Sequence, residues 1–123
     1  MRKAIQRALS ESTDGWNRAD LERFLAVYQD GRDTTLITGG KVIQGLVAIR
    51  RYYARRFVSG KPGAAGTLAI DLSHVRRFGE SHCLVIGRYR LAGAESGKTS
   101  RGLLTLIFQR GPAGWRIVSD HSS

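Results

Sequence analysis

The stretch that decides the fold is GLLTLIFQRGPAGWRIVSDHSS, residues 102–123. It contains two runs that resemble strands, and the GPAG between them is typical of a hairpin turn. Side chains alternate between the two faces of a strand. In the first run both faces are apolar, with Leu103, Thr105 and Ile107 on one and Leu104, Leu106 and Phe108 on the other. One face is expected to pack on helices and the other on a second copy, which predicts a homodimer through the outer sheet face.

Three helices are predicted in the first half of the chain. Residues 2–16 carry apolar side chains three and four positions apart, as one face of a helix does. A second helix is expected from a capping box at Asn17 and Asp20 to Gly31, and a third over residues 44–60. The inner faces of these two helices are expected to include Leu21, Phe24, Leu25 and Tyr28 in the second and Val47, Ile49, Tyr53 and Phe57 in the third.

Strands dominate the second half. A short strand is predicted at 34–38, between the second and third helices, and two long ones at 67–79 and 81–93. With the two strands of residues 98–123, they make an antiparallel meander that follows the helices. Segregated helices and strands indicate an α+β class, here in a single domain spanning residues 1–123.

Composition narrows the classes of protein. The chain has 123 residues and a formal net charge of +10, with no apolar run of membrane-spanning length. No secretory leader is recognisable, so a cytoplasmic protein is expected. The single cysteine, Cys83, excludes an internal disulfide, and no metal site or cofactor is expected. The cations are spread along the chain, so nucleic acid is not the expected partner. An anion site at Arg50, Arg51, Arg55 and Arg56 is the weaker alternative.

Three stretches together resemble a known family: WNRADLERFLAVY, GGKVIQGLVAIRRYY, and the hairpin quoted above. In this order they resemble the nuclear transport factor 2-like superfamily, and most closely its SnoaL-like branch of small bacterial proteins. The resemblance implies a cone-shaped, curved mixed or antiparallel sheet wrapped around three N-terminal helices, a cystatin-like α+β roll. It also implies an internal apolar cavity and a dimer. Members include cyclases, isomerases, dehydratases, epoxide hydrolases and association domains, so the fold does not determine the function.

The resemblance also implies which residues face the cavity. Alignment with the isomerase-like members turns Thr105 inward, together with alternate residues of the neighbouring strands, which include Cys83, Gly87 and Ser122. A pocket of several aromatic rings and a few polar groups suits a small, partly apolar molecule. The expected ligand-binding residues are Trp16, Tyr28, Tyr53, Val85, Tyr89, Arg101, Thr105, Val118 and Asp120.

Asp120 is the candidate catalytic residue. A carboxylate in an apolar cavity has a raised pKa and can act as an acid or base near neutral pH. The alternative is that Asp120 pairs with Arg101 or Arg116, or lies in water. The next residue, His121, should point to the opposite face, so the two make a poor catalytic pair. Ketosteroid isomerase chemistry is excluded, because the resemblance puts Leu36, Ser12 and Thr105 where that reaction needs acids and a tyrosine.

The hypothesis from sequence is therefore a cofactor-free, dimeric SnoaL-like protein whose pocket binds a small hydrophobic or aromatic molecule. Two alternatives are open. One is a cofactor-independent cyclase, isomerase or hydratase that uses Asp120 as its acid or base. The other is a protein-association module without catalysis, in which the sheet face is the functional surface.

Overall fold

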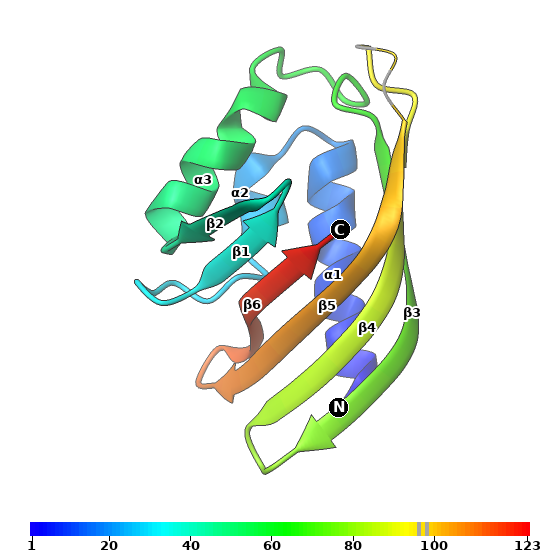
Figure 1. The fold of residues 1–123 in the computed structure, drawn as a ribbon. Coiled ribbons are helices and arrows are strands. Elements are labelled where there is room, and N and C mark those ends of the chain that lie inside the picture. Colours follow the sequence, from blue (N-terminus) through cyan, green and yellow to red (C-terminus); the bar gives the residue numbers. More distant parts are fainter. Residues whose placement is uncertain (96, 98) are drawn as a thin grey trace.

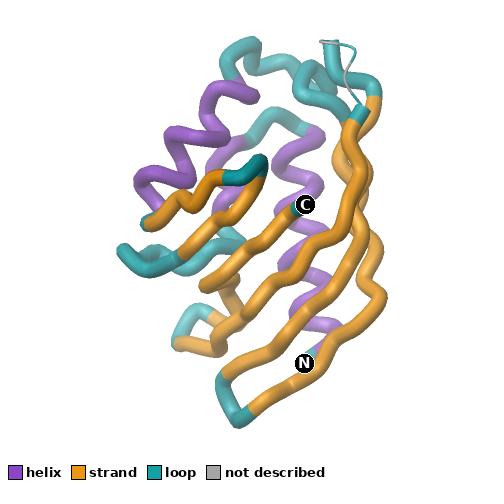
Figure 2. Tube along the Cα trace, in the orientation of Figure 1, coloured by secondary structure: helices purple, strands orange, loops and turns teal. Residues whose placement is uncertain are grey.

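The computed structural model describes residues 1–95, 97 and 99–123, which form one six-stranded sheet and three helices (Figures 1 and 2). The sheet order is β2-β1-β6-β5-β4-β3, and all neighbours are antiparallel except β1 and β6, which are parallel. The predicted α+β class with a curved mixed sheet is confirmed. In chain order the elements are α1 (Arg2–Asn17), α2 (Leu21–Leu25), β1 (Thr35–Thr38), β2 (Lys41–Gln44), α3 (Leu46–Ala54), a 3₁₀ turn (Arg55–Phe57), β3 (Thr67–Phe78), β4 (His82–Ala92), β5 (Ser100–Gly111) and β6 (Gly114–Ser122).

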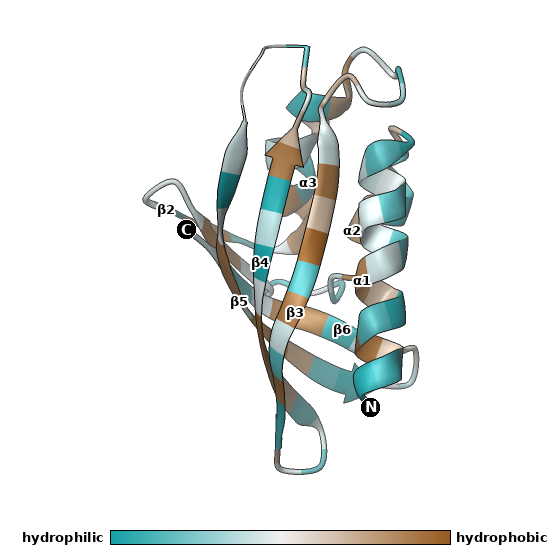
Figure 3. Cartoon of the chain, turned by 90° about the vertical axis from the view of Figure 1, so that its right-hand side faces the viewer, coloured by the Kyte–Doolittle hydropathy of each residue, from teal (hydrophilic) through white to brown (hydrophobic). Residues whose placement is uncertain are grey.

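Helix α1 lies along the concave side of the long strands (Figure 1). Its buried stripe consists of Ile5, Leu9, Ser12 and Trp16, spaced by four, three and four residues. Figure 3 shows the matching alternation of hydrophilic and hydrophobic residues along the helix beside β3. None of the helices in the described residues is long and apolar enough to cross a membrane.

The junction between α1 and α2 differs from the predicted capping box. Asn17 does not cap the second helix; its amide donates to the carbonyl of Leu68 at 3.2 Å, and its oxygen accepts from the Leu68 N–H at 2.7 Å. Asp20 is the cap instead, accepting from the backbone N–H of Arg23 at 3.1 Å. Asn17 therefore joins the end of α1 to the start of β3.

The second helix is much shorter than predicted. It ends at Leu25, and the backbone that follows pairs with β6. The N–H of Ile117 donates to the carbonyl of Val27 at 2.7 Å, and the N–H of Gln29 donates to the carbonyl of Ile117 at 2.9 Å. Tyr28, which lies between Val27 and Gln29, is therefore held beside Ile117 of the sheet.

The region between the second and third helices also contains a strand that the sequence analysis missed. Gly39 and Gly40, with φ of 56° and 76°, form the tight turn that folds β2 back onto β1. Helix α3 therefore begins only at Leu46. The predicted inner position of Val47 is wrong, because Val47 is 73% exposed, while Ile49 is fully buried.

The faces of β5 are distinguished by burial. Leu104, Leu106 and Phe108 are buried against the helices, whereas Leu103 is 46% exposed on the outer face. Residues paired across antiparallel strands share a face. Thr105 pairs with His121 of β6, and both are exposed. The predicted inward orientation of Thr105 is therefore wrong.

Candidate functional site

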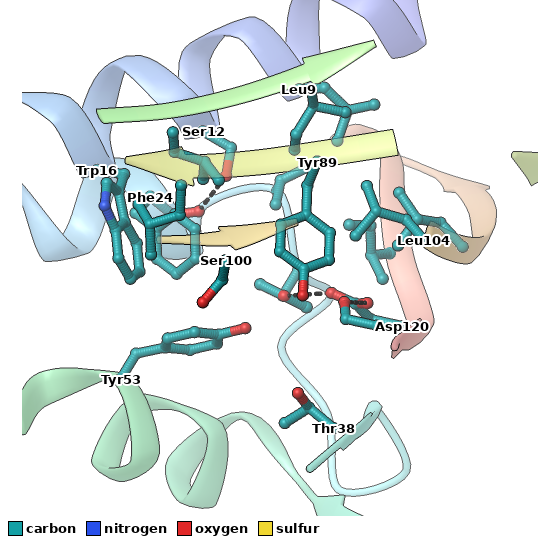
Figure 4. A pocket seen from close by; sticks show the side chains of 18 of the residues that line it. Leu9, Ser12, Trp16, Phe24, Thr38, Tyr53, Tyr89, Ser100, Leu104 and Asp120 are labelled. Atoms are coloured by element: carbon teal, nitrogen blue, oxygen red, sulfur yellow. Dashed lines mark hydrogen bonds between the residues drawn. The ribbon is translucent and has the colours of Figure 1, made fainter. Parts of the chain in front are cut away.

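A cavity of about 400 Å³ lies between the concave face of the sheet and the helices (Figure 4). Its walls come from every helix and from the long strands, so it forms only when the chain is folded. Apolar side chains such as Leu104, Leu106 and Ile117 belong to the sheet wall. The aromatic residues that line it are Trp16, Phe24, Tyr28, Tyr52, Tyr53 and Tyr89.

The aromatic rings support one another in edge-to-face contacts. The ring of Phe24 lies 5.1 Å from that of Trp16 and 4.8 Å from that of Tyr53, with interplanar angles of 70° and 80°. Tyr28 continues the cluster, at 6.4 Å from Phe24. Such contacts are favourable and orient the rings. This wall of the cavity is therefore well defined before any ligand enters.

Among the described residues that line the cavity, Asp120 is the only acidic one. It is 5% exposed, and its carboxylate accepts hydrogen bonds from the Tyr28 hydroxyl at 2.7 Å and the Ser122 hydroxyl at 2.8 Å. Burial raises the pKa of the Asp120 carboxyl above its ordinary value, and these two hydrogen bonds act in the opposite direction. The result is a carboxyl group that is easier to protonate than an aspartate in water.

A β-bulge turns Asp120 inward. Ile107 of β5 pairs with Ser119, and the next residue, Phe108, pairs with Ile117, so Val118 is the extra residue. Ile117 and Asp120 are both buried although they are three positions apart. In a regular strand they would face opposite sides.

The tyrosine hydroxyls are hydrogen-bond donors. Burial, followed by the neighbouring charge of Asp120, raises the pKa of both Tyr28 and Tyr53 above the usual value of a phenol. Both phenols are therefore protonated at neutral pH. The Tyr89 hydroxyl donates to the backbone oxygen of Ser123 at 2.8 Å.

The opening of the cavity is polar. Gly39, Arg56, Ser100 and Ser123 line it and are also exposed, so they border the entrance. In the described residues no group of three or more His, Cys, Asp or Glu side chains is placed to hold a metal ion. The chemistry that the site offers is that of one carboxyl, several hydroxyls and a set of aromatic faces.

Comparison with known proteins identifies the family. Residues 5–123 match the model of the SnoaL-like domain. The chain belongs to the SnoaL-like family. No curated protein matches the sequence.

Solved structures similar to this SnoaL-like protein share its fold. One is a nuclear transport factor 2-like protein of unknown function from Shewanella oneidensis MR-1, with a TM-score of 0.89 and 24% identity over 99% of this chain and 98% of that one. Another is a putative calcium/calmodulin-dependent protein kinase type II association domain from Thiobacillus denitrificans. Its TM-score is 0.77, and its sequence is 20% identical over 96% of this chain and 92% of that one. A third is a putative dehydratase from Streptomyces avermitilis. Its TM-score is 0.71, and its sequence is 19% identical over 98% of this chain and 93% of that one. At these identities they show the nuclear transport factor 2-like fold alone.

Five of the residues singled out in the sequence line this cavity together: Trp16, Tyr28, Tyr53, Tyr89 and Asp120. The other four do not line it. Val85 is fully buried in the core, and Val118 lies in the bulge. Arg101 and Thr105 are exposed, and Arg101 pairs with the exposed Arg90 across β4 and β5. The inward orientation predicted for Thr105 is corrected accordingly, and Val85, Val118 and Arg101 are corrected as residues that do not line this cavity.

The structure adds residues that the sequence analysis did not assign to the site. Leu104 and Leu106 face the cavity from β5, and Phe24 was expected only as an inner helix position. Tyr52 and Arg56 come from α3 and the turn that follows it. The only signal for the β5 residues was the apolar character of both its faces, which does not say which face is inside.

Proposed function

We propose that this SnoaL-like protein binds a small, partly apolar organic molecule in the cavity. The observation that carries the proposal is a space of about 400 Å³ that the protein's own side chains leave unfilled. Pockets for small molecules have volumes of this order and combine apolar walls with a few polar groups. Here the polar groups are Asp120, the tyrosine hydroxyls and the hydroxyls near the opening.

Filling the cavity tests this function. Ile70 lines the cavity from β3, while its neighbour Ala69 is exposed on the other face. Ile70→Trp should abolish binding of small aromatic and alicyclic compounds, measured by thermal shift and calorimetry across a broad panel. Ala69→Trp introduces the same side chain outside the cavity and should leave binding unchanged. If no compound binds the native protein, or if both variants bind equally well, the proposed function is wrong.

A second candidate function is acid–base catalysis by Asp120. The observation that favours it is a buried carboxyl with a raised pKa, hydrogen-bonded to Tyr28 inside the cavity. Once a substrate has been identified, Asp120→Asn should abolish turnover while preserving the fold. Turnover that survives this substitution would leave binding, rather than catalysis, as the function.

The outer face of the sheet supports a homodimer. Leu103 is 46% exposed there, and Ile86 and Ile107 lie on the same face because their partners across the sheet, Thr105 and Ser119, face outward with them. Light scattering should show a dimer that Leu103→Glu converts to monomers. A monomeric native protein would contradict this arrangement. A dimer with no ligand in any compound panel would favour the association-module alternative.

A further inference from the structure

The carboxylate of Asp120 has no cationic partner among the described residues. The ion pairs found there join Asp14 to Arg18 and Arg23, and Glu22 to Arg50, all at the surface. Asp120 is instead hydrogen-bonded by two neutral hydroxyls. Buried charges in proteins are normally paired, because an unpaired charge loses its hydration without compensation. An ionised Asp120 therefore lacks the compensation that a paired cation would give.

The hydrogen-bonding capacity of Asp120 is also incomplete. An ionised carboxylate offers about four acceptor positions, two on each oxygen. Tyr28 uses one position on one oxygen, and Ser122 uses one on the other. An ammonium group carries only donors, so it matches the positions that are left.

The surroundings of this carboxylate are aromatic. Figure 4 shows Trp16, Phe24, Tyr53 and Tyr89 around the same space as Asp120. The faces of aromatic rings attract cations through their quadrupoles, and the attraction is greatest where water is excluded. A carboxylate inside a set of rings favours a positively charged, apolar guest over a neutral one of equal shape.

We infer that the ligand of this cavity is an organic cation, an amine or ammonium compound with an apolar body, whose charged nitrogen lies beside Asp120. This inference rests on the proposed function, since it names the class of ligand for the same cavity. The apolar body would lie against Leu104, Leu106 and the aromatic wall.

Two features of the protein oppose the binding of a cation. The net charge is +10, and Arg56 lies at the opening. Arg56 is exposed, so water and salt screen its charge. Asp120 is buried, where a charge acts on its neighbours through a lower effective dielectric constant. The local attraction at Asp120 is therefore expected to exceed the repulsion at the entrance.

The experiment compares three compounds that share a naphthalene ring and differ in charge: naphthylmethylamine, naphthylmethanol and naphthoate. Calorimetry at neutral pH and fixed ionic strength should show that the amine binds the full chain about tenfold or more tightly than the alcohol, and that naphthoate binds most weakly. Asp120→Asn should remove the advantage of the amine, so that the amine and the alcohol bind this variant with affinities within about twofold of each other. Asp71→Asn removes the same charge from an exposed position on β3. It should change neither the affinity for the amine nor the affinity for the alcohol.

The outcomes separate this inference from the proposed function. If the alcohol or naphthoate binds as tightly as the amine, the cation inference is overturned while the cavity remains a ligand site. If none of the three binds, the cation inference is again overturned, and the compound panel with Ile70→Trp decides the proposed function. The comparison of the three compounds on the native chain needs no variant, so it holds even if Asp120→Asn does not fold.

Discussion

Removing the hydroxyl of Tyr28 should destabilise the protein more at high pH than at low pH. Tyr28→Phe keeps the ring and deletes the 2.7 Å hydrogen bond to Asp120. Because burial raises the pKa of Asp120 above its ordinary value of 3.8, this group contributes stability that is fully present below that value. The contribution is lost as the pH rises through the higher pKa of the folded state. The Tyr28 hydrogen bond favours the ionised form, so it limits that loss, and deleting it makes the loss larger.

The magnitude follows from the charge of the acceptor. A buried hydrogen bond to a neutral group contributes about 1 kcal/mol to stability, and one to a charged group about 1.5–3 kcal/mol. Tyr28→Phe should therefore reduce the free energy of unfolding by about 1 kcal/mol when Asp120 is protonated and by about 2 kcal/mol when it is ionised. The other titratable groups that interact with Asp120 are Tyr53 on α3 and His121 on β6, and Arg56, in the turn after α3, lines the same cavity.

Urea unfolding over a pH series, at one protein concentration, measures this difference. Tyr52→Phe is the control, since Tyr52 lines the same cavity and makes no hydrogen bond to Asp120 in the structure. It should show no pH dependence beyond that of the native protein. In the background of Asp120→Asn, the pH dependence of Tyr28→Phe should vanish. An equal loss at all pH values in the native background would refute the assigned pair of Tyr28 and Asp120.

Three further changes test the packing that positions the site. Gly15→Ala should lower the free energy of unfolding by about 1–3 kcal/mol in thermal or urea unfolding, despite the better helix propensity of Ala. The new methyl would overlap the Phe24 backbone nitrogen and lie 2.8 Å from the Arg23 carbonyl carbon. A stabilised variant would contradict this close contact between α1 and α2. Asn17→Ala should lower the free energy of unfolding in urea by about 1–3 kcal/mol, since both backbone groups of Leu68 lose their partner. The stability of Asn17→Asp should lie between that of Asn17→Ala and that of the native protein. Native Cys83 should resist alkylation until urea unfolds the chain, because it is fully buried and burial raises its thiol pKa; rapid labelling would place it at the surface.

Local patterns were sufficient for much of the fold. The stripe of Ile5, Leu9 and Trp16 predicted α1, and the four long strands appear close to where alternation and turn residues placed them. These features depend on neighbours within a few positions, which the sequence displays directly. The same patterns were insufficient where distant segments compete for the backbone. Residues after Leu25 continue a helical pattern, yet they pair with Ile117 of β6.

The site, like the fold, was predicted only in part from the sequence. The aromatic residues Trp16, Tyr28, Tyr53 and Tyr89 were identified from their residue types and the family resemblance. Thr105 was placed on the wrong face by the alignment with isomerase-like members. Alternation could not correct this placement, because both faces of β5 are apolar.

By itself, the sequence determined the α+β class, the order of helices and long strands, and a carboxylate at the end of the last strand. The family resemblance placed that carboxylate on the cavity side, and only the tertiary structure showed how the strand turns it there. The extra residue at Val118 shifts the alternation of β6, so that Ile117 and Asp120 lie on the same side, with Tyr28 held against them by its own pairing to the strand. The physical reason is that a bulge is set by pairing with β5 across the sheet, whereas periodicity records only the chain's own neighbours.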